Sequence, residues 1–364
     1  MTRAINFSAG PSTLPLPVLE EARAEFLEHQ GTGMSLIEMS HRGPHYTAVH
    51  EEAAVLARDV FGAPDEFALL FVQGGATLQF SMVPMNLLGD GRSGGYVVSG
   101  SWAKKAIADA RLYGDAYAAW DGSDEDFRRM PQPNEIEVRA GTRYLHVTSN
   151  ETIGGIQMFS WPDPGVPLIA DMSSDYFSRP IPWERFDLVY GGAQKNLGPA
   201  GVSLVFVRQS ALEAANRDLG TYLRYDVHRD GDSLYNTPPV FAIWMVGKVL
   251  RWVAAQGGLS AMEAGARNKS AILYDAIAAS GGYYRSPVEP ESRSMMNVVF
   301  RLPTEDLEAE FVAAAAAARM VGLKGHRSVG GCRASIYNAM PVEGVEALAA
   351  FMAQFQADHA WGLR

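Results

Sequence analysis

Lys195 lies in a glycine-rich loop, residues 191–201, that directly follows a short apolar run at residues 188–190. A lysine at the end of a buried strand, in a loop too rich in glycine to cover it, is positioned for covalent chemistry. A second apolar run, residues 168–171, ends in the carboxylate of Asp171. If the two strand ends face one ligand, they fit a pyridoxal 5'-phosphate site, in which the lysine forms the Schiff base and the aspartate keeps the pyridine nitrogen protonated. Alone, Lys195 is more often a solvated lysine and Asp171 a helix cap; together they favour the cofactor site.

A candidate phosphate cradle lies at residues 73–77 (QGGAT), between an apolar run and a helical pattern. Free backbone N–H groups at a helix start bind phosphate, and glycines allow its close approach. Ala76 and Thr77 belong to this cradle, and Thr77 adds a hydroxyl. The alternative is a turn that uses Gly-Gly for geometry only, since the segment lacks the Gly-Lys-Ser/Thr ending of a nucleotide P-loop.

Three further side chains follow the ends of predicted strands. Trp102 offers a flat face for stacking on a heteroaromatic ring, and Thr152 offers a hydroxyl to the substituents of such a ring. Gln194, beside Lys195, is placed to hydrogen-bond a cofactor oxygen. The alternatives are a core tryptophan and a simple turn at residues 150–155, but the shared position of these residues favours one ligand site.

Two His-Arg pairs and a third arginine are candidates for substrate binding. They are His41-Arg42 in residues 38–44, and His326-Arg327 with Arg333 in residues 325–335. Guanidinium groups bind carboxylate and phosphate bidentately, so this set suits a doubly acidic substrate. An isolated arginine is usually a solvated one.

From about residue 17 to residue 259, apolar runs alternate with helical patterns, which predicts a mostly parallel sheet covered by helices, an α/β domain. The predicted strands are residues 68–72, 95–98, 144–148, 168–171, 188–190 and 203–207. Open sheets of this kind bind ligands beyond the carboxyl ends of their strands. A helix at residues 238–256 closes the domain before Gly257-Gly258.

The remainder of the chain has a different pattern. This part is predicted to contain a helix at residues 261–280, a strand at 297–301, a helix at 304–321 and a terminal helix from residue 342. We therefore expect a large domain at residues 17–259 and a smaller α+β domain at 260–364, with residues 1–16 packing near the latter. Residues 121–142, which contain three consecutive acidic residues and two prolines, are predicted to form an exposed connection.

Composition narrows the function classes. The chain has 364 residues, 47% hydrophobic and 20% charged, which is typical of globular protein. Its net charge of −10 argues against non-specific binding to nucleic acid or to an anionic membrane. Cys332 is the only cysteine, so an intrachain disulfide and a cysteine-built zinc site are both excluded, and no metal site is predicted. No apolar run suits a signal peptide or a membrane span, and we expect a cytoplasmic protein.

Strings spread over almost the whole chain resemble the phosphoserine aminotransferase family, in family order. They are residues 7–11 (FSAGP), 38–42 (EMSHR), 74–77 (GGAT), 150–152 (NET), 170–174 (ADMSS), 192–201 (GAQKNLGPAG), 235–239 (YNTPP) and 325–339. The lysine string and the string from His326-Arg327 to Arg333 are specific to that family. Two departures are Gly43, where the family often has serine, and residues 121–142, which match nothing in it.

The resemblance implies a fold-type-I pyridoxal phosphate enzyme with a seven-stranded type of sheet, working as a homodimer with active sites at the subunit interface. It assigns Lys195 to the Schiff base, Asp171 to the pyridine nitrogen and Trp102 to ring stacking. The other cofactor contacts that it implies are Ala76, Thr77, Thr152 and Gln194, with Asn236 and Thr237 from the partner subunit, and the substrate contacts are His41, Arg42, His326, Arg327 and Arg333.

The implied reaction transfers an amino group between L-glutamate and 3-phosphohydroxypyruvate, giving O-phospho-L-serine and 2-oxoglutarate in serine biosynthesis. Members of the family often also use the phosphorylated hydroxythreonine precursor of pyridoxine. Because both half-reactions use one site, ping-pong kinetics are expected. The alternatives are a cysteine desulfurase with Cys332 as nucleophile, an aminotransferase for small uncharged amino acids, and a cofactor-binding protein without activity.

Overall fold

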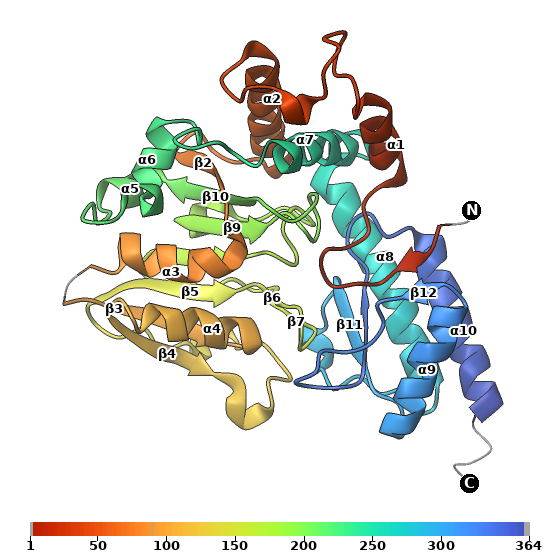
Figure 1. Ribbon diagram of the computed structural model, residues 1–364. Helices are drawn as coiled ribbons and strands as arrows, with labels where there is room; N and C mark the ends of the chain where they lie inside the picture. Colours follow the sequence, from red (N-terminus) through yellow and green to blue (C-terminus); the bar gives the residue numbers. More distant parts are fainter. Residues whose placement is uncertain (1–2, 90, 360–364) are drawn as a thin grey trace.

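The computed structural model describes residues 3–89 and 91–359, and its central feature is a seven-stranded sheet with helices on both faces (Figure 1). The strand order is β2-β10-β9-β8-β5-β3-β4. β10 is antiparallel to both of its neighbours, and the other adjacent pairs are parallel. The strands are β2 Phe67–Val72, β3 Ser93–Val98, β4 Asp115–Asp121, β5 Thr142–Thr148, β8 Leu168–Asp171, β9 Leu188–Gly192 and β10 Ser203–Arg208. This confirms the predicted α/β class and the mostly parallel sheet.

The sequence patterns miss β4, the edge strand of this sheet. Its residues are DAYAAWD, and alanine has a low preference for strands, so no apolar run marks it. The prediction of an exposed connection at residues 121–142 is also partly wrong. Met130 is buried, and its N–H donates to Ser292 Oγ at 2.9 Å. This segment therefore joins the sheet edge to the C-terminal part of the chain.

The two faces of the sheet are covered by different helices because strand side chains alternate between faces. Leu70 and Val72 pack with α3 (Gly75–Leu87) and α4 (Ser101–Ala110). Phe71, on the opposite face, packs with α2 (Pro44–Phe61) and α7 (Val240–Ala255). The shorter helices of this part are α1 Leu16–Glu25, α5 Gln209–Glu213 and α6 Tyr225–Asp230.

The C-terminal part has its own hydrophobic core around an antiparallel pair of strands, β11 and β13. Its helices are α8 Gly258–Ala279, α9 Glu305–Ala317 and α10 Val342–His359, and its strands are β11 Asn297–Phe300, β12 Met320–Val321 and β13 Cys332–Ser335. The predicted helix at residues 304–321 ends early, at Ala317, because the next residues form β12. β12 pairs in parallel with β1 (Ile5–Asn6) from the N-terminal segment. We propose residue 259 as the boundary between two domains.

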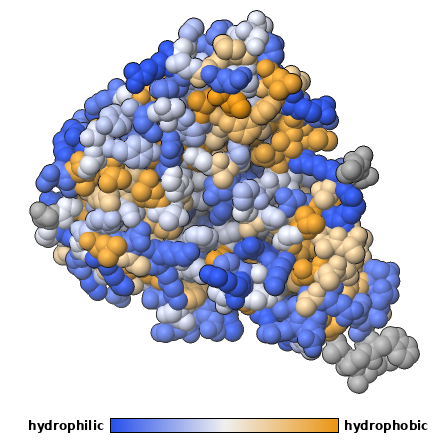
Figure 2. Space-filling view, viewed as in Figure 1, coloured by the Kyte–Doolittle hydropathy of each residue, from blue (hydrophilic) through white to orange (hydrophobic). Residues whose placement is uncertain are grey.

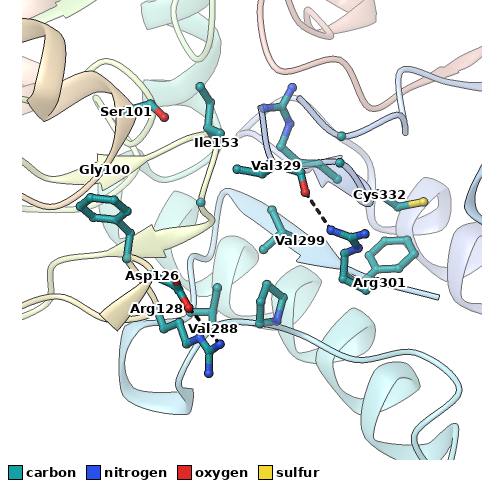
Figure 3. Close-up of a pocket in the computed structure, with 17 residues that line it drawn as sticks. Gly100, Ser101, Asp126, Arg128, Ile153, Val288, Val299, Arg301, Val329 and Cys332 are labelled. Carbon is teal, nitrogen blue, oxygen red and sulfur yellow. Dashed lines mark hydrogen bonds and ion pairs between the residues drawn. The ribbon is translucent and has the colours of Figure 1, made fainter. Parts of the chain in front are cut away.

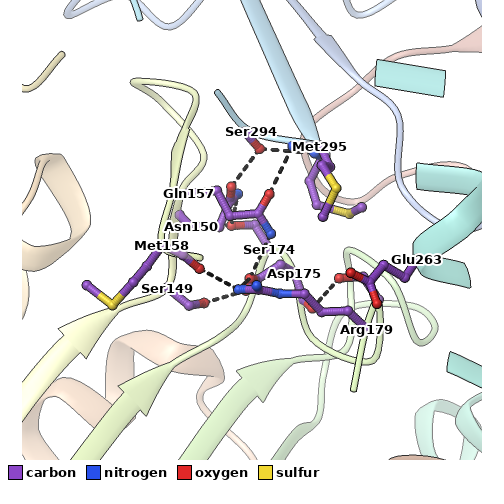
Figure 4. Close-up of polar contacts among 12 residues, drawn as sticks. Ser149, Asn150, Gln157, Met158, Ser174, Asp175, Arg179, Glu263, Ser294 and Met295 are labelled. Carbon is purple, nitrogen blue, oxygen red and sulfur yellow. Dashed lines mark hydrogen bonds and ion pairs between the residues drawn. The ribbon is translucent and has the colours of Figure 1, made fainter. Parts of the chain in front are cut away.

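A buried polar network joins the sheet to the C-terminal part beside the ends of β5 and β8 (Figure 4). Asn150 donates to Asn297 Oδ1 at 2.8 Å and accepts from Ser294 Oγ at 2.6 Å. Gln157 accepts from the N–H of Met295 at 2.9 Å. Since buried polar groups are costly when unpaired, these bonds fix the loops at the strand ends against the second half of the molecule. No helix among the described residues is long and apolar enough to cross a membrane.

Candidate active site

Lys195 lies in the turn after β9, where its side chain reaches into a cavity. Its Nζ donates to Thr152 Oγ1 at 2.7 Å and stands 5.6 Å from the centroid of the Trp102 ring. The backbone of the turn is held by Ser12, whose Oγ donates to the Lys195 carbonyl at 2.5 Å. Burial lowers the pKa of Lys195 to about 8, although Asp171 and Glu151 oppose this shift. About a tenth of the amine is therefore neutral at pH 7, far more than for an ordinary lysine, and this fraction can act as nucleophile or base.

Asp171 ends β8, the strand adjacent and parallel to β9, so its carboxylate and Lys195 meet at the same sheet edge. Asp171 is buried, and its Oδ1 accepts from the N–H and the Oγ of Ser173 at 2.9 and 2.6 Å. Burial raises the pKa of Asp171, while the two bonds from Ser173 and the charge of Lys195 lower it. A cation placed against this carboxylate would further favour its ionised form.

Seven of the nine predicted cofactor residues line one cavity, and Asn236 and Thr237 do not. Its lining comprises Gly75, Ala76, Thr77, Trp102, Thr148, Asn150, Thr152, Asp171, Ser173, Ser174, Gln194 and Lys195. Trp102 Nε1 and Thr148 Oγ1 are buried and lack a hydrogen-bond partner among the residues that the structure describes. Buried polar atoms are rarely left unpaired, so the cavity suits a ligand with its own polar groups.

The start of α3 forms one wall of this cavity. Gly74 and Gly75 have φ angles of 89° and 64°, and a Cβ at Gly74 would come within 2.6 Å of Leu78. Glycine is therefore required here. No side chain caps the helix, which leaves its first N–H groups for an anion. An amine, a carboxylate, a flat aromatic face and a phosphate cradle in one cavity fit pyridoxal phosphate.

Glu151 is a site residue that the sequence analysis did not single out. It is fully buried, and its carboxylate accepts from the N–H of Trp102 at 3.1 Å and from that of Ala103 at 2.8 Å. It thus caps α4 from outside the helix, since no side chain of α4 does so. A Cβ at Gly100 would lie 2.6 Å from Glu151 Cδ, so glycine makes room for it. Burial raises the pKa of Glu151 to about 7.

Of the predicted substrate residues, Arg333 lies beside the cavity. Its Nη1 donates to the Thr152 carbonyl at 3.3 Å, and burial lowers its pKa. His326 and Arg327 lie on a loop at residues 325–331, in which His326 Nδ1 and Ser328 Oγ are 2.7 Å apart. A cleft between this loop and the large domain is lined by Ser101, Ile153, Val329 and Arg333, among others (Figure 3).

Seven predicted residues do not line the Lys195 cavity of their own chain. They are His41, Arg42, Asn236 and Thr237, and also the three on the C-terminal part, His326, Arg327 and Arg333. The first two lie between η1 (Leu36–Glu38) and α2, where Arg42 Nε is 3.4 Å from His41 Nε2. The Thr237 carbonyl accepts from Nε2 of Gln73, the first residue of the phosphate cradle, at 3.1 Å.

Cys332 does not have the properties of a catalytic nucleophile. It lies in β13, paired with Phe300, and is 1% exposed. Burial raises its pKa to about 12. A nucleophilic cysteine needs an accessible thiolate, so the geometry argues against the desulfurase alternative.

Comparison with known proteins agrees with this geometry. The family model described as aminotransferase class-V matches residues 4–348. Phosphoserine aminotransferase from Niallia circulans is 52% identical over 355 residues, 97% of this chain and 98% of that protein. The structure of phosphoserine aminotransferase from Bacillus circulans subsp. alkalophilus superposes with a TM-score of 0.96 at 52% identity, covering 98% of this chain and 99% of the other. That of the pyridoxal-phosphate-bound phosphoserine aminotransferase from Trichomonas vaginalis gives 0.92 at 37% identity, covering 96% and 100%.

Proposed function

The chain belongs to the class-V aminotransferases and, within them, to the phosphoserine aminotransferase family, and we propose that it exchanges amino and oxo groups between L-glutamate and 3-phosphohydroxypyruvate. The products are O-phospho-L-serine and 2-oxoglutarate, as in serine biosynthesis. The observation that carries this proposal is the cavity in which Lys195, with its lowered pKa, is hydrogen-bonded to Thr152 beside Asp171 and Trp102.

Different residues of the chain have different roles in the proposed reaction. When bound, pyridoxal phosphate would take up the amino group of the substrate and disperse the negative charge left at the substrate's α-carbon. Lys195 is the covalent anchor, and its freed Nζ moves the proton to and from the α-carbon. Asp171, held by Ser173, keeps a proton on the ring nitrogen, and Trp102 covers the ring face. The N–H groups at the start of α3 and the Thr77 hydroxyl hold the phosphate.

Substrate specificity is proposed to rest on His41, Arg42, His326, Arg327 and Arg333. The γ-carboxylate of glutamate and the phosphate of phosphoserine are both anions at the end of the molecule away from the reacting carbon, so one set of guanidinium groups serves both substrates. Turnover of the phosphorylated hydroxythreonine precursor of pyridoxine is proposed as a secondary activity.

A homodimer is proposed because four predicted site residues of the large domain, His41, Arg42, Asn236 and Thr237, lie outside the cavity that this domain forms. Large apolar side chains are exposed on α1, η1 and the start of α7, and this face shows as an apolar area near α1 and α7 (Figure 2). Leu27 is 82% exposed, and Phe26 and Phe241 about 40%. Patches of this kind mark protein interfaces. Joined through this face, two copies bring Arg42 and Asn236 of one subunit toward the cavity of the other.

The proposed reaction is tested by a comparison of substrate pairs. Purified enzyme should convert 3-phosphohydroxypyruvate with L-glutamate, and should use alanine with glyoxylate far less. Arg327→Ala should raise the KM for the phosphorylated substrate, because a guanidinium pair to phosphate is lost. Preference for alanine and glyoxylate would favour an aminotransferase of small uncharged amino acids. A cytoplasmic location is part of the proposal and is checked by cell fractionation.

A further inference from the structure

The loop at residues 325–331 is internally bonded but needs an external support. The N–H of Gly325 donates to the Gly331 carbonyl at 2.8 Å, and the N–H groups of Val329 and Gly330 donate to the His326 carbonyl at 3.0 and 2.9 Å. Gly330 and Gly331 have φ angles of 67° and 70°. These bonds shape the loop without fixing where it stands relative to the active site.

Arg301, directly after β11, contacts the loop from beneath. Its Nη1 donates to the Val329 carbonyl at 2.8 Å, as Figure 3 shows, and its Nε donates to Glu308 Oε1 at 2.6 Å. Its side chain also packs against the loop backbone, since a Cβ at Gly331 would come within 2.5 Å of Arg301 Cδ. The planar guanidinium bonds a carboxylate and a carbonyl at the same time.

Glu308 completes the support from the first turns of α9. The residue is 7% exposed, and its Oε2 accepts from the N–H of Gly331 at 3.1 Å. Its Oε1 accepts from Arg301 Nε and, at 3.3 Å, from the N–H of Leu302. The two residues, which we call the Arg301–Glu308 clasp, thus hold the loop at Val329 and at Gly331.

We propose that the Arg301–Glu308 clasp is a positioning device that sets where His326 and Arg327 stand, and so determines affinity for the anionic end of the substrate. This inference rests on the proposed function, which assigns substrate binding to the loop. Neither clasp residue lines the Lys195 cavity. Loss of the clasp should therefore weaken substrate binding and leave the chemical step at Lys195 unchanged.

The test compares Glu308→Gln and Arg301→Lys with the control Glu305→Gln. Glu305 is one turn earlier on α9, is 91% exposed and lies 3.9 Å from the same arginine. It offers the same substitution at a carboxylate that makes no hydrogen bond to the loop among the described residues. We expect about a tenfold rise in the KM for 3-phosphohydroxypyruvate in both clasp variants, with kcat within about twofold of wild type. Hydrogen exchange of residues 325–331 should be faster in both, and Glu305→Gln should resemble wild type.

Two outcomes would overturn the inference. One is a folded clasp variant whose KM equals that of wild type, although Arg327→Ala raises the KM. This result would contradict the role of the clasp and leave the proposed function intact. The other is a fall in kcat with KM unchanged, which would place the effect on the chemistry. If Glu308→Gln does not fold, Arg301→Lys, which keeps the positive charge, tests the role of the clasp alone. If Arg327→Ala itself leaves KM unchanged, the loop does not bind substrate and the assignment of substrate residues fails as well.

Discussion

At the scale of single residues, the chemistry depends on how burial changes the two groups at the sheet edge. Lys195 and Asp171 were predicted from the sequence because each ends or follows a short apolar strand, and the carboxyl ends of neighbouring parallel strands meet. The direction of their pKa shifts could not be predicted, because it depends on how much protein surrounds each group. The pKa of Lys195 falls to about 8 and that of Asp171 rises.

The lowered pKa of Lys195 predicts the pH dependence of cofactor attachment. Only the neutral amine attacks the cofactor aldehyde, so uptake of pyridoxal phosphate by apoenzyme should rise with pH and level off above a midpoint near 8. Asp171→Asn removes a negative charge that stabilises the protonated amine, so the midpoint should move to lower pH. Stopped-flow absorbance measures both. A midpoint near that of an ordinary lysine, about 10.4, would contradict the burial argument.

At the scale of elements, the sequence predicted the buried strands and the long helices better than the edges and the contacts between elements. The six strands predicted for the large domain exist because their apolar runs are long enough to stand out, whereas β4 has no apolar run and three of its seven residues are alanine. Glu151 was not singled out because its role comes from α4, which lies about 50 residues earlier in the chain. Contacts of this kind become visible only when the loops are placed in space.

The contact between Glu151 and α4 predicts an effect on cofactor binding. Glu151→Gln keeps the size of the side chain and one acceptor oxygen. Its amide nitrogen cannot accept the bond that Oε2 receives from the N–H of Trp102 at 3.1 Å, and the negative charge at the start of α4 is lost. We expect pyridoxal phosphate to bind about tenfold more weakly, equivalent to about 1.4 kcal/mol, because the cap of the ring-stacking helix is weakened. Titration of apoenzyme, followed by tryptophan fluorescence, measures this.

Asp121→Asn is the control for Glu151→Gln. Asp121 accepts from the N–H of Ser123 at 2.9 Å at the start of a short 3₁₀-helix and is exposed, remote from the lining of the Lys195 cavity. Its variant should bind the cofactor as wild type does. Equal affinity of all three proteins would show that Glu151 supports the fold alone.

At the scale of the whole molecule, we propose that a second copy of the chain completes the site. The sheet supplies the cofactor cavity, and the C-terminal part supplies Arg333 and the loop at residues 325–331. Arg42 lies between η1 and α2 and, like Arg333 and the loop, is not among the residues that line the Lys195 cavity. The sequence resemblance implied shared sites, and we propose on that basis that Arg42 acts across the interface.

Hybrid dimers test the sharing of sites. Lys195→Ala and Arg42→Ala should each abolish most of the activity, but subunit exchange between them forms hybrids with one intact site if Arg42 acts across the interface. An equal mixture should then recover about a quarter of wild-type activity. Exchange between Lys195→Ala and Asp171→Ala is the matched control, since both residues line the Lys195 cavity of one chain. If neither mixture recovers activity, Arg42 acts in the site of its own subunit.

The account as a whole depends on Lys195 as the point of covalent attachment. The most direct measurement is reduction of the holoenzyme with borohydride, followed by digestion and mass spectrometry of the peptides. We expect the pyridoxyl group on Lys195 alone, and Lys195→Ala should carry no label and lose at least about 10²–10⁴-fold in turnover. A label on another lysine, or full activity of Lys195→Ala, would contradict the mechanism.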